Sequence, residues 1–204
     1  MGLVRSSESG KYVIDRLFGA DTYALICSPY ISEQYAKEIV QLAKRGRLVK
    51  VLTTDKITER NFYIRDYFKE AKRSEHLETL KTLVMKHCGQ SLEHSKMYII
   101  DDKYAVIGSA NLTRPGMWKN SETINIYETE TEVKAVKVVF EEAWKNALES
   151  AFGISSKFKR TSYPRYGGTG RSEYYRQSLN RQEEATNKGS FLDAIIKELK
   201  SWIE

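Results

Sequence analysis

The chain has 204 residues, 41% of them hydrophobic and 29% charged, and its formal net charge is +6. These values are typical of globular proteins and exclude a wholly disordered chain. The sequence contains no apolar run of the ~18–20 residues that a membrane span needs, and residues 1–10 lack the apolar core of a secretory signal. Its two cysteines cannot make a disulfide framework, and no CxxC pair is present for zinc. We therefore expect a reducing, cytoplasmic location and no stable association with membranes.

Hydrophobic periodicity predicts an alternation of helices and strands. In chain order, the expected elements are a helix over residues 11–18, a strand over 23–28, a helix that begins after Ser32 and stops at Gly46, a strand over 48–53, a helix around 64–71, strands over 80–85, 96–100, 104–107 and 123–127, and a long helix over 133–148. The turn-like residues 101–103 separate two of these strands. Strands that alternate with helices indicate an α/β fold, in which helices flank both faces of a mixed sheet.

The composition changes after Phe152. Residues 155–188 contain almost no aliphatic side chains and many Ser, Arg, Gly and Tyr residues. Such a composition is typical of a long loop or of a segment that orders on binding. A final amphipathic helix is expected after Gly189. The sequence thus predicts an α/β domain over residues 1–152 and a basic extension over residues 153–204 that ends in this helix.

The excess positive charge of the chain lies in one segment of this extension. Residues 154–182 contain seven basic side chains and a single acid, Glu173, whereas the rest of the chain has equal numbers of both. A local charge of +6 indicates an element that binds a polyanion. Aromatic rings interleaved with arginines suit stacking on bases together with neutralisation of phosphates. The candidate nucleic-acid contacts are Tyr163, Tyr166, Arg165, Arg171, Arg176 and Arg181.

Two other interpretations of the extension stay open. The basic segment could be a solvated tail without a ligand. The last helix could pack on the domain or support a dimer, because its polar face lacks the strong basic bias of helices that lie on membranes.

One stretch combines residues suited to phosphate chemistry at fixed spacings. One residue separates His94 from Lys96, four separate Lys96 from Asp101, and six more precede residues 108–111 (GSAN). A second short motif, KNSE, ends in Glu122. This pattern, HxKx4Dx6GSxN, resembles the signature of the phospholipase D superfamily at every defining position. Glu122 resembles the glutamate that follows the signature in the single-motif bacterial endonucleases of that superfamily.

The same residues make chemical sense around a phosphodiester. Alternation along a strand places His94 and Lys96 on one face, and Lys96 supplies positive charge for the non-bridging oxygens. Ser109 and Asn111 add hydroxyl and amide donors. Neutral His94 can attack phosphorus and form a covalent phosphohistidine, and Glu122 can accept from its other ring nitrogen and fix the tautomer. Because fixed side chains supply the charge stabilisation, we expect no metal and no other cofactor.

The resemblance implies two further features. Asp101 would have an orienting, structural role rather than direct contact with the substrate. A second acid–base group is also needed, because the leaving oxygen must be protonated and water must later be activated, yet neither His76 nor His87 begins a second copy of the signature. Single-motif members meet this need with a twofold dimer. We therefore expect a homodimer whose active site is shared across the axis and contains His94 from each chain.

The sequence therefore predicts a homodimeric, metal-independent endonuclease with a phospholipase D-like catalytic domain. Its expected partner is nucleic acid, with DNA favoured and RNA as the alternative. Two other functions stay open. One is a phospholipase D that acts on lipid head groups, which the short chain and its single signature disfavour. The other is a non-catalytic DNA-binding module of a restriction or repair complex.

Overall fold

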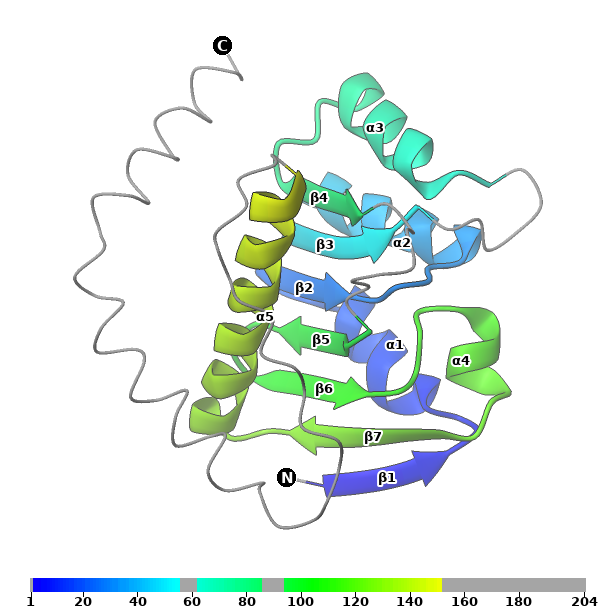
Figure 1. Ribbon diagram of the computed structural model, residues 1–204, viewed down its shortest axis with the longest axis vertical. Helices are drawn as coiled ribbons and strands as arrows, with labels where there is room; N and C mark the ends of the chain where they lie inside the picture. The colour runs from blue at the N-terminus through cyan, green and yellow to red at the C-terminus, as the bar shows by residue number, and fades with distance from the viewer. Residues whose placement is uncertain (1, 56–61, 86–93, 152–204) are drawn as a thin grey trace. The chain divides into compact units, whose positions relative to one another are not determined.

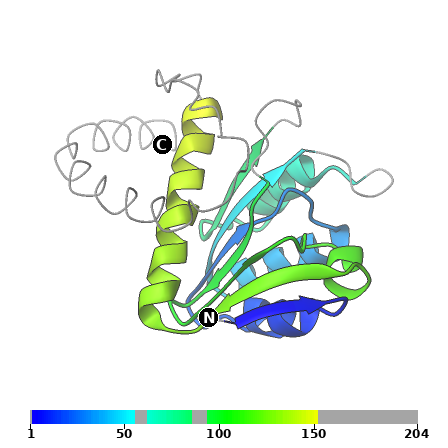
Figure 2. The same ribbon diagram turned by 60° about the horizontal axis from the view of Figure 1, so that its bottom comes forward.

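Figures 1 and 2 show the computed structural model of the chain, which describes residues 2–55, 62–85 and 94–151. All of these residues belong to one compact unit, Met1–Lys157. The basic segment with its six candidate nucleic-acid contacts and the expected last helix lie outside the described residues. The division into a 1–152 domain and a 153–204 extension therefore stays a prediction.

The unit is built on one seven-stranded mixed sheet (Figure 1). Its strands are β1 (Gly2–Ser6), β2 (Tyr23–Cys27), β3 (Leu48–Thr54), β4 (Leu80–Met85), β5 (Lys96–Ile100), β6 (Tyr104–Gly108) and β7 (Glu122–Tyr127). The order across the sheet is β1-β7-β6-β5-β2-β3-β4. Strands β2, β3 and β4 run parallel to one another, whereas β5 is antiparallel to β2 and the pairs beyond it are antiparallel as well. The mixed sheet confirms the predicted fold class.

Helices cover both faces of this sheet, as predicted. They are α1 (Gly10–Phe18), α2 (Glu33–Lys44), α3 (Ile64–Ser74), α4 (Arg114–Trp118) and α5 (Glu130–Ala151). In Figure 1, α5 crosses in front of the strands, while α1 and α2 lie behind them. Figure 2 shows the same arrangement from another direction, with α5 along one face of the sheet.

Each face of the sheet has its own apolar core. Towards α1, α2 and α3, strand residues such as Ile26 and Tyr98 are almost fully buried. Towards α5, Leu25 and Met97 pack with Phe140 of that helix. Neighbouring residues of one strand thus enter different cores, so that central strands are buried along their whole length. This double burial explains why β2 and β5 have continuous apolar runs instead of an alternation.

Two short elements were not expected from the sequence. Strand β1 lies at the edge of the sheet beside β7, with Val4 packed on the core and Leu3 largely exposed. Its sequence GLVRS has only two apolar side chains and neither a longer apolar run nor an alternation. Helix α4 contains Pro115 and Gly116, which usually interrupt helices. Pro115 is tolerated in the first turn because the N–H that it lacks would have no helical partner there. Thr113 caps the same turn by accepting a hydrogen bond from the Gly116 N–H at 3.2 Å.

Candidate active site

Apart from Asp101, the signature residues lie at one edge of the sheet because of the register of three antiparallel strands. Lys96 at the start of β5 lies opposite Gly108 at the end of β6, and Gly108 lies opposite Ile124 near the start of β7. In Figure 1 this edge is on the right, where the arrowheads of β2, β3 and β4 also point. The site therefore lies at the carboxyl ends of the parallel strands, where open α/β sheets usually bind ligands.

Lys96 lies on the same face of β5 as Tyr98, and His94 precedes the strand by two residues. Tyr98 belongs to the core towards α1 and α2, so strand alternation places Lys96 on that side of the sheet. His94 is exposed, whereas Lys96 is only 8% exposed. The Lys96 ammonium donates a hydrogen bond to the backbone carbonyl of His94. This contact fixes the lysine charge beside the histidine.

Ser109 and Glu122 form a hydrogen-bonded pair across β6 and β7. The Ser109 hydroxyl donates to Glu122 Oε2 and accepts from the Thr123 N–H at 3.1 Å. Asn120 Nδ2 donates to the other carboxylate oxygen at 3.3 Å. Glu122 is 8% exposed, so these donors compensate a largely buried carboxylate.

This pairing is a contact that the sequence did not predict, and the catalytic roles expected for Ser109 and Glu122 stay predictions. Among the described residues, the Glu122 carboxylate accepts hydrogen bonds from Ser109 and Asn120, and not from the His94 ring. The Ser109 hydroxyl has one proton, and it donates that proton in the hydrogen bond to Glu122. In this structure Ser109 and Glu122 therefore hold each other at the same edge of the sheet as Lys96.

Gly108 allows β7 to approach β6 closely beside this pair. A Cβ atom on Gly108 would lie 2.3 Å from the carbonyl oxygen of Thr123 and 2.8 Å from Cα of Ile124. Backbone atoms cannot move aside as a flexible side chain can, so any other residue here would separate the strands. The glycine of the signature thus serves the approach of a neighbouring strand.

Asn111 is held between two buried residues whose backbones are anchored. The carbonyl of Ala110 accepts a hydrogen bond from the Tyr98 hydroxyl at 2.7 Å. The N–H of Leu112 donates to Ser28 Oγ at 2.9 Å. Tyr98 is fully buried, and burial raises the pKa of its hydroxyl above the ordinary value, which keeps it protonated as a donor. Asn111 Oδ1 is itself buried and has no hydrogen-bond partner among the residues that the structure describes.

Helix α4 supports Asn111 from its other side. A Cβ on Gly116 would lie 2.5 Å from the Asn111 carbonyl oxygen, so the helix packs directly on this backbone. Trp118 Nε1 donates to the Tyr35 hydroxyl at 2.9 Å and ties α4 to α2. The sequence alone does not indicate these supports, because the residues are far apart in the chain and none of them carries a reactive group.

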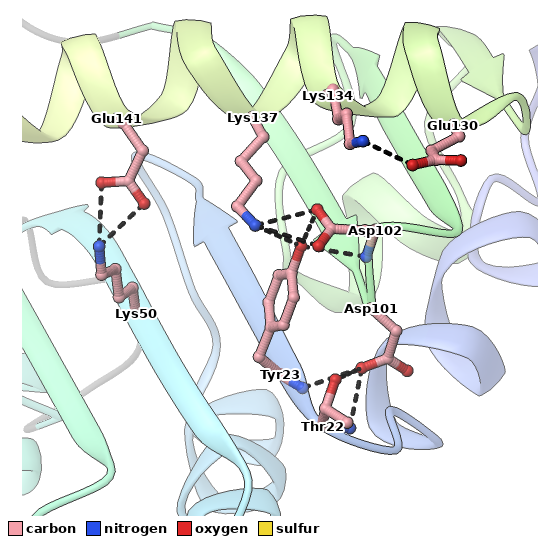
Figure 3. Close-up of polar contacts among 9 residues, drawn as sticks. All are labelled: Thr22, Tyr23, Lys50, Asp101, Asp102, Glu130, Lys134, Lys137 and Glu141. Carbon is pink, nitrogen blue, oxygen red and sulfur yellow. Dashed lines mark hydrogen bonds and ion pairs between the residues drawn. The ribbon is translucent and has the colours of Figure 1, made fainter.

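Asp101 lies at the opposite end of the β5–β6 hairpin (Figure 3). Its carboxylate accepts hydrogen bonds from the backbone N–H groups of Asp21, Thr22 and Tyr23 at 2.8, 2.8 and 2.9 Å, and from the Thr22 hydroxyl at 2.7 Å. Partial burial alone would raise the pKa of Asp101, but these donors outweigh it and lower the pKa below its ordinary value. Asp101 thus joins the hairpin to the start of β2, at a distance from the other signature residues.

The next residue, Asp102, takes part in a second contact that was not expected. Asp101 and Asp102 both have a φ of 53°, and the Lys103 N–H donates to the Ile100 carbonyl at 2.9 Å, which is typical of a type I′ turn. The Asp102 carboxylate accepts from the Tyr23 hydroxyl and from Lys137 Nζ on α5, the latter at 2.9 Å (Figure 3). These two hydrogen bonds, first that of Tyr23 and then that of Lys137, lower the pKa of Asp102.

Neither a metal-binding cluster nor a membrane-spanning helix occurs among the described residues. These parts of the chain contain no group of three or more His, Cys, Asp or Glu residues placed to hold a metal ion. Of the helices in the same parts, none is both long and apolar enough to cross a bilayer.

Comparison with known families shows the family of the chain. Residues 13–144 match the family described as cardiolipin synthase, PLD-like domain. The chain belongs to this phospholipase D-like family. The matched range includes every residue of the signature from His94 to Glu122. No curated protein sequence matches the chain.

Three solved structures share the fold. NucT from Helicobacter pylori is 17% identical, with a TM-score of 0.54 over 71% of this chain and 94% of its own. Nuc, a phospholipase D family member from Salmonella typhimurium, is 20% identical, with a TM-score of 0.53 over 71% and 93% of the two chains. TrmBL2, an archaeal chromatin protein, is 19% identical, with a TM-score of 0.50 over 71% and 52%.

The Asp101 contacts generate a prediction about stability and pH. In Asp101→Asn the side-chain amide would face one of the backbone N–H donors, so we expect the free energy of unfolding at pH 7 to fall by about 1–3 kcal/mol. The lowered pKa means that the carboxylate contributes fully above its ordinary value of 3.8 and that the contribution is lost as pH falls through the folded pKa. Urea unfolding at pH 7 and at pH 3 measures both effects.

Asp21→Asn provides the matched control for this prediction. The Asp21 side chain is exposed and lies 3.5 Å from Lys103, so its replacement should change the free energy by less than about 1 kcal/mol. Equal destabilisation by the two variants, or an Asp101→Asn effect that does not shrink at pH 3, would contradict the proposed orienting role.

Proposed function

We propose that the chain is a phosphodiesterase that cleaves nucleic acid and that His94 is its nucleophile. The observation that carries this proposal is that the exposed His94, the buried Lys96 cation and the anchored Asn111 lie at the same carboxyl edge of the sheet. Membership of the phospholipase D-like family supports phosphodiester chemistry at this edge.

In the first step a ring nitrogen of His94 attacks phosphorus. The P–N bond forms as the P–O bond to the leaving group breaks, and the partner subunit's His94 gives its proton to the leaving oxygen. Lys96 stabilises the charge on the non-bridging oxygens. The Asn111 side chain adds an amide whose Nδ2 can donate a hydrogen bond to the phosphate.

In the second step water replaces the histidine. Water attacks phosphorus and gives a proton to the partner subunit's His94, the P–N bond breaks, and both histidines return to their starting states. The Ser109–Glu122 pair keeps the ends of β6 and β7 together throughout, since neither of its groups takes up or releases a proton in these steps. All charge stabilisation in this scheme comes from fixed side chains, so cleavage should survive EDTA.

The substrate class rests on three points of support. The signature with its following glutamate resembles single-motif endonucleases, the extension carries a local charge of +6 with interleaved tyrosines, and the similar fold of TrmBL2 belongs to a protein described as binding DNA. We favour DNA over RNA and place the protein in the cytoplasm.

A lipid substrate is the second candidate, because the matching family is described by the name of cardiolipin synthase. Cardiolipin synthesis concerns a phosphodiester as well, so the same His94 chemistry would apply. Incubation of the purified chain with plasmid DNA, RNA and phosphatidylcholine vesicles, with and without EDTA, separates the candidates. A non-catalytic DNA-binding module would bind DNA and cleave none of them.

Substitution of the nucleophile should remove activity while it preserves the fold. We expect His94→Asn to lower the rate of DNA cleavage by at least about 10²–10⁴-fold, because the exposed side chain contributes little to the core. His76→Asn is the matched control, since His76 is exposed and its φ of 50° is one that Asn tolerates. A His94→Asn chain that retained more than one-tenth of the rate would exclude His94 as the nucleophile.

A shared site should also make mixed dimers inactive. When wild-type and His94→Asn chains are mixed in equal amounts and exchange at random, about one quarter of the dimers are wholly wild-type. Activity per wild-type chain should then fall to about one half of its unmixed value. Unchanged activity per wild-type chain would mean that each chain works alone, as would sedimentation of a fully active monomer.

The basic extension should bind substrate without taking part in chemistry. We expect the replacement of Arg165, Arg171, Arg176 and Arg181 by Gln to weaken DNA binding. The slope of log K against log salt should decrease by roughly 0.7–0.9 for each phosphate that an arginine no longer neutralises. Hydrolysis of bis(p-nitrophenyl) phosphate, which is too small to reach these arginines, serves as the control and should be unchanged. An unaltered salt slope would show that the extension does not hold the polyanion.

A further inference from the structure

A basic hollow lies at the far edge of the sheet from β1. It has a volume of about 310 Å³ and is lined by Arg65, Lys69 and Lys72 of α3 and by Thr82 and Val84 of β4. We propose that this hollow, the α3–β4 groove, binds backbone phosphates of the nucleic-acid substrate away from the reacting phosphorus. The proposal rests on the function proposed above and extends it to a second contact surface within the described residues.

The cations of the groove form a single row. Arg65, Lys69 and Lys72 are spaced by four and three residues, which places them on one face of α3. Thr82 and Val84 are alternate residues of β4, so both point to the same side of that strand. Lys72 lies seven residues after Arg65, which corresponds to about 10 Å along the helix. One phosphate ion cannot contact such a row along its whole length, whereas successive phosphates of a polymer can.

The groove has an excess of positive charge. Arg65 contacts Asp55 at 3.1 Å and donates to the Val84 carbonyl at 3.0 Å, while Lys69 and Lys72 have no ion pair among the described residues. Burial lowers the pKa of Lys72, and the nearby charge of Lys81 lowers it further. A bound anion would relieve this repulsion and replace part of the missing hydration.

The groove and the candidate active site face the same edge of the sheet. Arg65 is in the first turn of α3, and its contacts to Asp55, just after β3, and to Val84, near the end of β4, place it at the carboxyl edge. Figure 1 shows α3 beside β4 with the start of the helix towards that edge. A substrate that leaves the active site along the edge therefore meets Arg65 first and the two lysines after it.

The distance between the candidate active site and the α3–β4 groove corresponds to a short length of duplex. Strands β5 and β4 are three positions apart in the sheet, which corresponds to roughly 14 Å at the usual strand spacing. A duplex rises about 3.4 Å for each base pair, so about four base pairs cover this distance. Short diesters cannot occupy the candidate active site and the α3–β4 groove at the same time. The groove should therefore contribute to the binding and cleavage only of duplexes longer than about four base pairs.

The test combines a charge-neutral variant with substrates of increasing length. Lys69→Gln/Lys72→Gln should lower kcat/KM for duplexes of 12 or 20 base pairs by about tenfold, because two phosphates are no longer neutralised. The same variant should leave bis(p-nitrophenyl) phosphate and a dinucleotide unaffected. Lys134→Gln/Lys145→Gln on α5, across the sheet, removes the same charge and is the matched control. Thermal unfolding shows whether each variant is folded, and Lys69→Gln alone, at an exposed position, is used if the double variant is not.

Binding by an inactive chain separates the groove from the activity. In a His94→Asn background, affinity for a fluorescent 20-base-pair duplex should fall by about tenfold when the groove lysines are replaced. If the wild-type chain cleaves no substrate, the proposed activity fails and this binding result still decides the groove. Unchanged duplex binding, an equal decrease on the small diester, or weaker binding only to anionic phosphatidylglycerol vesicles would each overturn the proposal.

Discussion

The close approach of β6 and β7 at Gly108 is the constraint on which the candidate active site depends. A Cβ on residue 108 would lie 2.3 Å from the Thr123 carbonyl oxygen and 2.8 Å from Ile124 Cα. Because glycine has no Cβ, both atoms of β7 fit beside it. With the strands at this distance, the Ser109 hydroxyl reaches both the Glu122 carboxylate and the Thr123 N–H. The ends of β6 and β7 are thereby fixed relative to each other before any substrate binds, which is the preorganisation that electrostatic catalysis requires.

The β5–β6 hairpin divides the signature between two tasks. At one end, Lys96 lies opposite Gly108, and its ammonium donates a hydrogen bond to the backbone carbonyl of the exposed His94. At the other end, Asp101 holds three backbone N–H groups before and at the start of β2. The contacts of Asp102 with Tyr23 and Lys137 then connect this turn to α5 on the other face. The opposite end thus anchors the hairpin both to the start of β2 and to α5, while His94 before β5 stays exposed.

Much of the fold could be predicted from the sequence because it depends on local patterns. The apolar runs of β2, β3 and β5 and the helical periodicity of α5 identify these elements to within a few residues. β1 has neither a longer apolar run nor an alternation, and the five residues of α4 are too few to show a helical period. The Ser109–Glu122 pair and the anchoring of Asn111 could not be predicted, since they depend on strand register and on contacts between distant residues such as Tyr98 and Ala110. The roles of the signature residues came from their spacing and remain predictions of chemistry.

The register of the hairpin also limits how its length can vary. Residues 96–108 are one continuous path along β5, through a tight turn and back along β6. One inserted residue in either strand would turn the following side chains to the other face of the sheet. Lys96 would then point towards α5, or Ser109 would move away from Glu122. The fixed intervals in the sequence pattern are therefore a condition of strand geometry, and a hairpin of another length could keep the chemistry only by adding whole two-residue repeats to both strands at once.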